Sequence, residues 1–504
     1  MPDARPLAYL EARVLFAPRG TDAVLIDGGT IAAVGPESEV RRSAPAGTEF
    51  ERLGGRWILP GLIDPHLHWL AATLGRAGVD LRGVRGPEEI GRAVAAASDR
   101  TPGGPLLGGG WDQERFSRVE YPTRAALDGI GPDRPVALYR VCHHVALVNG
   151  AALDRLGIGR STPDPPGGRI GRGPDGAPNG LLFDAALRAL RPLEEESFRS
   201  CAAEATDWLA RLVGRGLTTV GVLSALPAEV DAARAIPSHR TVPRLRLYPG
   251  WSVADGLRSE AVPPGEPAVG ISGLKIVLDG SLGARTAALS EPYADRPDEA
   301  GLLVSSEEEI ESAAQAAEAH GWALAMHAIG DRAVARALDW GERLAGRVPV
   351  RLEHASVVPD ALLDRLARGR VPTVVQPGFV RSDRWIPERL GPVRRRWAYR
   401  FREMVDRGVP VAGSSDAPVE PADPWTGLHA AVAEAGLTPE EALAMYTHRA
   451  ADALGRPALG RIAVDSQADL VVLDVADLGA AIARGGPLRA VVSGGRRVAP
   501  GAAI

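Results

Sequence analysis

Short apolar runs recur along the middle of the chain, and polar segments with a helical pattern separate them. The eight runs span residues 57–68, 217–224, 244–251, 273–280, 323–330, 350–356, 371–378 and 409–418. Amphipathic stretches follow them, such as EEEIESAAQAAEAHG after the fourth run and ALLDRLARG after the sixth. Because strands that alternate with helices form a parallel sheet covered by helices, this order predicts an α/β fold, a closed (β/α)8 TIM-like barrel.

The two ends of the chain have a different pattern, of short strands and turns. Residues 1–60 contain LEARVLF and AVLIDGGTIAAVG, in which DGG is typical of a hairpin turn, and residues 455–504 contain ADLVVLD and RAVVSGG. Neither end is long enough for its own core, so we expect both to form one composite β-sandwich, leaving 61–454 as the barrel. Roughly 140 residues separate the first two barrel runs, more than a helix and two loops require. Residues of about 70–205 are therefore predicted to be an insertion that caps the barrel mouth.

Composition and charge exclude several classes of protein. The 504 residues are 45% hydrophobic, which suffices for a large core, and the formal net charge of −5 provides no basic surface for nucleic acid. No apolar run reaches the roughly eighteen residues of a membrane span, and the N-terminus lacks the pattern of a signal peptide. Only two cysteines occur, Cys142 and Cys201, as is usual in a reducing compartment. We therefore expect a cytoplasmic protein without nucleic-acid or membrane partners.

Candidate chemistry lies at the end of the first barrel run, in the sequence Pro65-His66-Leu67-His68. Residues i and i+2 of a strand project to the same side, so the two imidazoles can bind one metal ion. Active-site residues of parallel barrels lie at the C-terminal ends of the strands. We interpret His66 and His68 as metal ligands rather than as polar residues of an ordinary loop.

Four further runs have a polar side chain near their ends, at the same level of the predicted barrel. These residues are Lys275, His327, His354 and Asp416. A single histidine is more often structural than a ligand, but six side chains that converge on one rim favour a metal site. His239, His320, His429 and His448 lie in helical or loop patterns without such partners, and we interpret them as structural.

Lys275 is the only lysine of the chain, which uses arginine for every other cationic side chain. Arginine cannot lose its proton in a protein, whereas a neutral lysine amine can add carbon dioxide and become a carbamate. The two carbamate oxygens could bridge two divalent cations. Such ions lower the pKa of a bound water from 15.7 toward about 7 and supply hydroxide at neutral pH. Asp416 would accept a proton from it as general base and deliver that proton to the departing amine as general acid.

The chain resembles the amidohydrolase superfamily, and within it the YtcJ-like branch of amidohydrolase-3-type proteins, which includes N-substituted formamide deformylases. The similar segments include PGLIDPHLH, LKIVLDGSLGARTAALSEPY, HAIGDRAV, RLEHAS and GSSDAPVEP. The resemblance implies a metal-dependent hydrolase that cleaves a C–N bond of a small molecule. It further implies two Zn2+ ions and an N6-carboxylated (carbamylated) Lys275. The implied metal-site residues are His66, His68, Lys275, His327, His354 and Asp416.

Further residues in segments typical of this branch are candidates for binding the substrate. They are Trp111, His144, Asp279, Arg285 and Asp331. Loops of a cap and of a barrel mouth usually line the cleft between them. Each residue could equally be architectural, since an Asp–Arg pair in a loop is more often a structural salt bridge than a substrate clamp.

Two other functions remain open. A deaminase on the same barrel would use one metal ion and no carbamate, so Lys275 argues against it. A catalytically silent binding or regulatory protein would be expected to have lost ligands, and none of the candidates is missing. A serine hydrolase is disfavoured because the chain has no G-x-S-x-G motif. The expected partner is a small-molecule substrate, and a homodimer is compatible with the sequence, as is a monomer.

Overall fold

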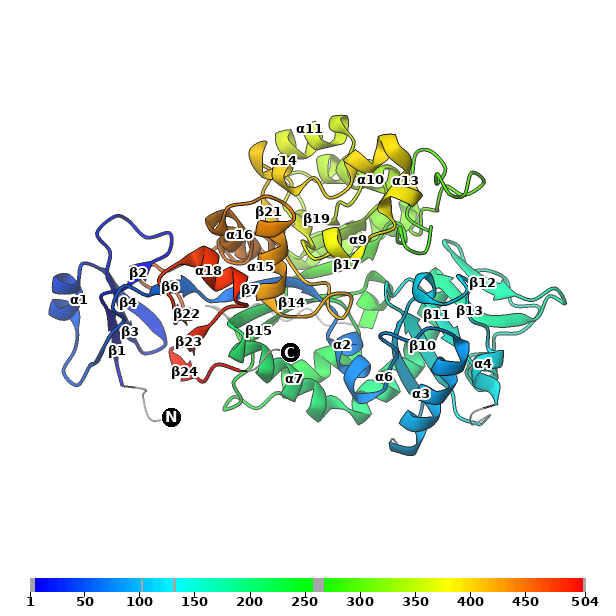
Figure 1. The fold of residues 1–504 in the computed structure, drawn as a ribbon, viewed down its shortest axis with the longest axis horizontal. Helices are drawn as coiled ribbons and strands as arrows, with labels where there is room; N and C mark the ends of the chain where they lie inside the picture. Colours follow the sequence, from blue (N-terminus) through cyan, green and yellow to red (C-terminus); the bar gives the residue numbers. More distant parts are fainter. Residues whose placement is uncertain (1–4, 101–102, 130–132, 257–266, 502–504) are drawn as a thin grey trace.

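The computed structural model describes residues 5–100, 103–129, 133–256 and 267–501. Three parts follow one another along its longest dimension (Figure 1). A β-rich part with the N-terminus lies at one end, a part with many helices lies in the centre, and a six-stranded sheet lies at the other end. The strands that carry the candidate ligands belong to the central part.

The central part contains two sheets of parallel strands. Four strands have the order β16-β15-β14-β7, and five have the order β17-β18-β19-β20-β21. The strands are β7 (Leu62–Leu67), β14 (Leu217–Ala225), β15 (Arg244–Pro249), β16 (Val269–Ile271), β17 (Gly273–Val277), β18 (Ala323–Ala328), β19 (Val350–His354), β20 (Thr373–Val375) and β21 (Val411–Gly413). Each of the eight apolar runs contains one of these strands, and β16 is additional.

Two isolated bridges join the two sheets, one between Gly250 and Lys275 and one between Leu67 and Ala417. At one junction, residues 245–247 of β15 pair with β16 instead of with β17. At the other, the contact lies beyond the end of β21, where the N–H of Asp416 donates to the carbonyl of His66. The fold is therefore α/β and TIM-barrel-like. Instead of the continuous closed barrel expected from the sequence, its strand pairing is divided between two sheets.

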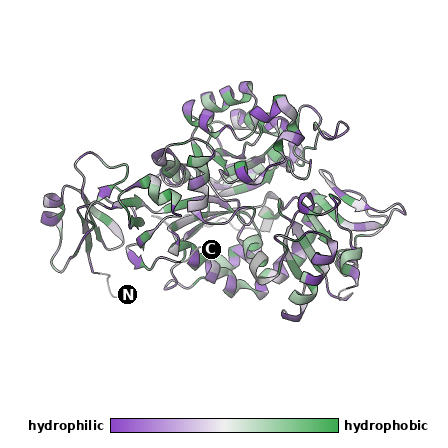
Figure 2. Ribbon diagram, in the orientation of Figure 1, coloured by the Kyte–Doolittle hydropathy of each residue, from purple (hydrophilic) through white to green (hydrophobic). Residues whose placement is uncertain are grey.

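Helices connect successive strands and cover their outer side. They include α7 (Ala202–Gly214), α8 (Pro227–Ala235), α9 (Glu307–His320), α10 (Asp331–Arg343), α11 (Asp360–Gly369), α13 (Ile386–Arg394) and α15 (Pro424–Ala433). α9 shows the local causes: the hydroxyl of Ser306 accepts a hydrogen bond from the N–H of Glu309, and Gly321, with φ 65°, follows its last residue. The outer helices carry both hydrophilic and hydrophobic colours in Figure 2, as expected for helices with one face on a core.

Strands from both ends of the chain form the β-rich part. One sheet has the order β4-β3-β1-β5 and the other the order β2-β6-β22-β23-β24. The strands are β1 (Leu7–Leu10), β2 (Arg13–Val14), β3 (Ala23–Asp27), β4 (Thr30–Gly35), β5 (Glu49–Arg52), β6 (Trp57–Pro60), β22 (Leu470–Leu473), β23 (Leu488–Ser493) and β24 (Arg496–Val498). Tyr9, Val24, Ile58 and Leu470 belong to one buried cluster between the sheets. β6 runs almost directly into β7, which links this part to the ligand-bearing strands.

A six-stranded sheet, called the cap sheet below, is inserted between β7 and β14. Its order is β12-β13-β11-β10-β9-β8. The strands are β8 (Val79–Asp80), β9 (Leu106–Trp111), β10 (Val136–Arg140), β11 (Val145–Val148), β12 (Gly168–Arg172) and β13 (Pro178–Asp184), and the helix α3 (Pro87–Arg100) lies beside them. The connection between β10 and β11, residues 141–144, reaches the ends of the central strands, since the rings of His144 and His327 are 4.9 Å apart.

None of the helices in the described part of the chain is both long and apolar enough to cross a lipid bilayer.

Candidate metal centre

The two histidines of β7 point at one carboxylate. Nε2 of His66 lies 3.2 Å from Oδ1 of Asp416, and Nε2 of His68 lies 3.0 Å from the same oxygen. The three side chains each offer a ligand atom, and these atoms lie within 4.8 Å of one another. Asp416 is held there because its N–H donates to the carbonyl of His66, at 2.8 Å. The i, i+2 spacing on a strand therefore has the consequence expected from the sequence.

Neighbouring side chains fix the orientation of these imidazoles. Nδ1 of His66 lies 2.6 Å from Oε2 of Glu353, whose other oxygen accepts a hydrogen bond from Nε of Arg351 at 2.6 Å. Nδ1 of His68 lies 3.0 Å from the carbonyl oxygen of Leu223. Burial alone would raise the pKa of Glu353, but Arg351 and His66 outweigh it and hold the pKa well below its usual range. Glu353 is thus an anion, and both histidines keep Nε2 for the centre.

His327 and His354 complete a ring of imidazoles at the ends of β18 and β19. The ring centroids of His327 and His354 are 4.5 Å apart, and those of His66 and His354 are 5.0 Å apart. Nδ1 of His354 lies 2.9 Å from Oε1 of Gln376, whereas Nε2 of His327 lies 3.1 Å from the carbonyl oxygen of Gly280. Burial lowers the pKa of both, that of His354 to about 3. Both rings are therefore neutral, the form that binds metals.

Lys275 lies on β17 and is 3% exposed. Burial lowers the pKa of its amine to about 8, and the attraction of Glu353 and Asp416 opposes that shift. A substantial fraction of the amine is therefore neutral near pH 8. The structure places Lys275 against the same cavity as His68, His327, His354 and Asp416.

The centre leaves three buried polar atoms without a hydrogen bond within the described chain. They are Nε2 of His66, Nζ of Lys275 and Oδ1 of Asp416. A buried polar atom without a partner is costly, by about 1–3 kcal/mol. A divalent cation accepts imidazole nitrogen and carboxylate oxygen as ligands, so the donor set fits such an ion.

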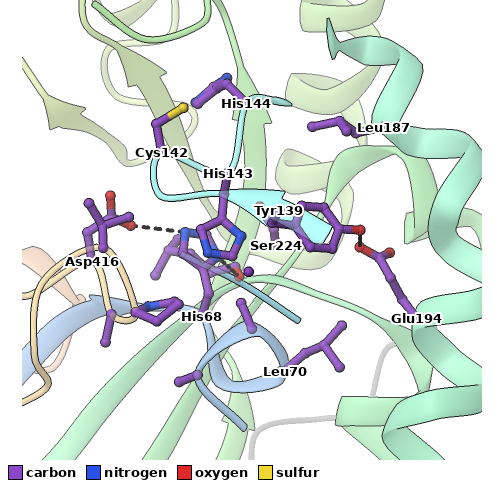
Figure 3. A pocket seen from close by; sticks show the side chains of 18 of the residues that line it. His68, Leu70, Tyr139, Cys142, His143, His144, Leu187, Glu194, Ser224 and Asp416 are labelled. Atoms are coloured by element: carbon purple, nitrogen blue, oxygen red, sulfur yellow. Dashed lines mark hydrogen bonds and ion pairs between the residues drawn. The ribbon is translucent and has the colours of Figure 1, made fainter. Parts of the chain in front are cut away.

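The ligand cluster borders a cavity of about 480 Å³ (Figure 3). Residues 139–144 of the cap sheet contribute Tyr139, Cys142, His143 and His144 to its lining. His143 was not predicted from the sequence. Its ring is stacked on Tyr139, with centroids 5.3 Å apart, and its φ of 57° is unusual for a residue with a Cβ. The signal that could have identified His143 is its position directly before His144 in CHHVALVN.

Of the predicted substrate residues, His144 lies in the cavity lining. Its Nδ1 is 2.9 Å from Oδ1 of Asp184, the last residue of β13. Burial opposes protonation, but the carboxylate of Asp184 outweighs it and raises the pKa of His144.

The other four predicted substrate residues do not lie among the described residues that line either of the two cavities of the site. Trp111 is completely buried in the cap sheet and donates to the carbonyl of Leu138. Arg285 pairs with Asp295 at 2.7 Å. Asp331 accepts a hydrogen bond from the N–H of Ser290 at 2.9 Å. These contacts are architectural, the alternative that the sequence left open for each residue.

Asp279, the remaining candidate, lies beside the ligand His327 and outside both cavities. It is completely buried and accepts hydrogen bonds from the backbone N–H groups of Ala288, Ile329 and Gly330. Its Oδ1 lies 3.5 Å from Nε2 of His327. It therefore ties the loop after β17 to the loop after β18, and burial raises its pKa to about 7.

Three residues that support the ligands were missed. Glu353 precedes His354 in RLEHAS, and Gln376 lies in VVQPGF. Asp64 precedes the histidine pair and accepts hydrogen bonds from the N–H of His66 and from the hydroxyl of Ser415. The available signal in the sequence was a polar residue in or beside an otherwise apolar strand. The sequence does not show which ligand each of these residues supports, because the ligands that they contact come from distant segments.

The sequence and structure were compared with known proteins. The model of the amidohydrolase family matches residues 52–499, and a model of an imidazolonepropionase-like composite domain of bacteria matches residues 23–46. The chain is 32% identical to the putative amidohydrolase YtcJ of Bacillus subtilis (strain 168), over 90% of each chain. It is 29% identical to N-substituted formamide deformylase of Arthrobacter pascens, also over 90% of each.

A solved structure has the same arrangement. It is an uncharacterized metal-dependent hydrolase from Pyrococcus horikoshii OT3, with a TM-score of 0.77 and 29% identity over 94% of this chain and 98% of that one. The family model, the similar sequence and the similar structure each match nearly the whole length of the chain. The chain belongs to the amidohydrolase family, in its YtcJ-like, amidohydrolase-3 branch.

Proposed function

We propose that this protein hydrolyses an amide-type C–N bond of a small molecule with the help of two divalent cations, for which zinc is the first candidate. The coarse class, a metal-dependent amidohydrolase, follows from the family. The observation that supports a metal centre in this chain is the set of three buried atoms on His66, Lys275 and Asp416 that make no hydrogen bond within the described chain. The residues that would hold the metal are His66, His68, Lys275, His327, His354 and Asp416.

When bound, the cations would supply an acidified water and a positive charge that polarises the substrate carbonyl. Asp416 would take a proton from the attacking water and return it to the departing amine. Burial raises its pKa, but His66 and His68 outweigh that effect and keep it well below its usual range. Asp416 is therefore ionised at neutral pH, the form that a general base requires.

Lys275 would act as a carbamate. An ammonium group would repel cations, whereas the carbamate is an anion with two oxygens. Formation requires the neutral amine, and burial provides it by lowering the pKa of Lys275 to about 8. The reaction consumes one carbon dioxide and releases one proton, so ample bicarbonate should favour it.

The proposal can be tested with the purified full chain. Zinc content would be measured together with intact mass after growth in bicarbonate, and hydrolysis would be followed with N-substituted formamides and longer amides. One relative is named an N-substituted formamide deformylase, which makes these amides the first choice. We expect two metal ions per chain, a mass increase of one carbon dioxide, and release of an amine. Release of ammonia would indicate a deaminase, and tight metal without turnover would indicate a binding protein.

We also propose how the chain is divided. Residues 1–60 and 455–504 would form one composite β-sandwich, and 61–454 the hydrolase barrel with its insertion at about 70–205. The pairing of β6 with β22 and the position of the cap sheet support this division.

A further inference from the structure

Two cavities of unequal size meet at the candidate metal centre. The larger has a volume of about 480 Å³ and the smaller a volume of about 100 Å³. His144, His327, His354 and Asp416 line both. His68 and Lys275 line only the larger one. Residues of the ligand cluster therefore border both cavities, and a substrate bound at the centre has both within reach.

The larger cavity has a broad apolar surface. Its lining includes Leu70, Leu74, Leu187, Trp208, Leu226, Trp251 and Val304. Several polar side chains of its lining are engaged with the protein itself. Tyr139 donates to Glu194, Arg191 donates to the hydroxyl of Ser252, and both oxygens of Glu229 accept backbone N–H groups. Away from Lys275 and the other residues of the ligand cluster, the cavity therefore offers mainly apolar contact.

Aromatic and aliphatic side chains enclose the smaller cavity. Leu282, Ile329, Phe379, Trp385 and Tyr399 line it, and none of them lines the larger one. The ring of Phe379 is parallel to that of His354, with centroids 6.5 Å apart. Tyr399 is fixed because its hydroxyl donates to Asp383.

Other side chains that line the smaller cavity are also held in place by contacts within the protein. Arg140 lines it and is 1% exposed, with Nε donating to Gln113 and a terminal nitrogen to Asp112, at 2.7 and 2.6 Å. Trp385 closes it against the loop after β17, where a Cβ on Gly283 would lie 3.1 Å from Cζ2 of the indole. Walls held by such contacts cannot open at low cost.

Size decides what the smaller cavity can hold. An engineered cavity of about 150 Å³ holds a benzene molecule. At about 100 Å³ the smaller cavity is below that size, whereas the larger cavity exceeds it several-fold. A ring thus fits on one side of the centre and only a compact group on the other.

We propose that the two cavities are subsites for the two sides of the scissile bond, so that the substrate joins a bulky, largely apolar group to a compact group, with Trp385 setting the upper size of the compact one. This inference rests on the proposed function, because it takes the ligand cluster as the place of bond cleavage. Trp385 would be a specificity-determining residue that contributes nothing to the metal centre.

The test uses N-substituted hydroxamates, R–CO–N(OH)–R′, as metal-binding probes of the zinc-loaded full chain. One probe has a small acyl group and a benzyl group on nitrogen, a second has the reverse arrangement, and a third is bulky on both sides. Dissociation constants would be measured by isothermal titration calorimetry. We expect the doubly bulky probe to bind at least about tenfold more weakly than the better of the other two. The preferred asymmetric probe shows which side accepts the acyl group.

Variants separate the two subsites. In Trp385→Ala, the dissociation constant of the doubly bulky probe should come within about threefold of that of the preferred asymmetric probe. The reason is that the removed indole is the group that excludes the second bulky substituent. Trp385→Phe should give an intermediate ratio and guards against misfolding of the alanine variant. Trp251→Ala, a change of the same kind in the larger cavity, should leave the ratio unchanged.

Three results would overturn the inference. Wild-type protein could bind the doubly bulky probe as tightly as the asymmetric ones, or both Trp385 variants could keep the wild-type ratio, or Trp251→Ala could abolish it. Size-independent binding would remove only the two-subsite inference. Failure of every hydroxamate to bind zinc-loaded protein would remove the proposed metal centre with it.

Discussion

Nδ1 of His66 lies 2.6 Å from Oε2 of Glu353, and both side chains are completely buried. A carboxylate can only accept, so this contact assigns the proton of His66 to Nδ1 and leaves the lone pair of Nε2 facing Asp416. Arg351 holds the other oxygen of Glu353 and prevents the carboxylate from turning. One ligand of the candidate centre is thus oriented by a neighbour that lies 287 residues away in sequence.

Replacing Glu353 should weaken metal binding. Glu353→Gln keeps the size of the side chain but removes the charge that orients His66, and we expect zinc affinity to fall about 10–100-fold. Competition with a chelator measures the affinity. Glu342→Gln, at an exposed position on α10, is the matched control. An unchanged zinc affinity in Glu353→Gln would contradict the orienting role.

Removing the amine of Lys275 should stabilise the metal-free protein. Its pKa falls from 10.5 to about 8 in the folded state, so below pH 8 the folded chain carries a buried ammonium that the unfolded chain exposes to water. This penalty is complete below pH 8 and disappears as the pH rises to 10.5. We expect Lys275→Met to raise the free energy of unfolding at pH 7, with little gain near pH 10.5.

Urea denaturation of bicarbonate-free, metal-free protein at both pH values measures this difference. The same variant should lose bound metal, which separates stability from function. A Lys275→Met protein that is less stable than wild type at pH 7 would show that the amine has a stabilising partner after all.

Asp416→Asn should lower turnover strongly. Asparagine keeps the shape of the side chain but cannot accept a proton, so we expect kcat to fall about 10²–10⁴-fold with the best amide of the panel. Asp339→Asn, at an exposed position, should keep the wild-type rate. Steady-state kinetics and zinc content would be measured together. A near-normal kcat in Asp416→Asn would exclude the proton-transfer role.

Arg389 should fasten the cap sheet to the central part. It is 1% exposed, donates to Glu114 of the cap segment at 2.7 Å, and also pairs with Asp295 of the loop after β17. Arg389→Met removes the hydrogen bonds to Glu114 and Asp295 and leaves Arg285 as their remaining cationic partner, and we expect a loss of about 1–3 kcal/mol in stability. Hydrogen exchange should also become faster in residues 106–116.

Chemical denaturation and amide exchange measure both effects. Arg384→Met removes an exposed arginine from the same region and should change neither. Wild-type exchange rates in the cap segment of Arg389→Met would contradict the fastening role.

The strands that carry the ligands could be predicted because their signals are local. Each is a short apolar run that contains a polar residue, and the i, i+2 spacing of His66 and His68 by itself places both side chains on one side. The division into two sheets could not be predicted in this way. It depends on which strand edges come together in the folded protein: β15 pairs with β16, and an isolated bridge between Leu67 and Ala417 joins β7 to the segment after β21.

The roles of residues whose partners lie far away in sequence also could not be predicted from the sequence. Trp111 and Arg285 lie in segments similar to those of relatives, but whether such residues face a cavity depends on the packing of the cap sheet and its loops. Glu353 carries its role only because β7 brings His66 to it from 287 residues away. Pattern and spacing identify candidates, whereas burial and partners decide between chemistry and architecture.

The connection of β6 to β7 has a consequence for how the protein is made. Ile58 and Leu59 of β6 pair with Val472 and Val471 of β22, and Arg56 reaches Asp474 across 418 residues of sequence. During synthesis, β6, which leads to His66 and His68, therefore cannot pair with β22 until nearly the whole described chain has left the ribosome. Contacts of such long range form slowly. A nascent chain should thus acquire metal late, and zinc offered during translation should gain little over zinc offered after release.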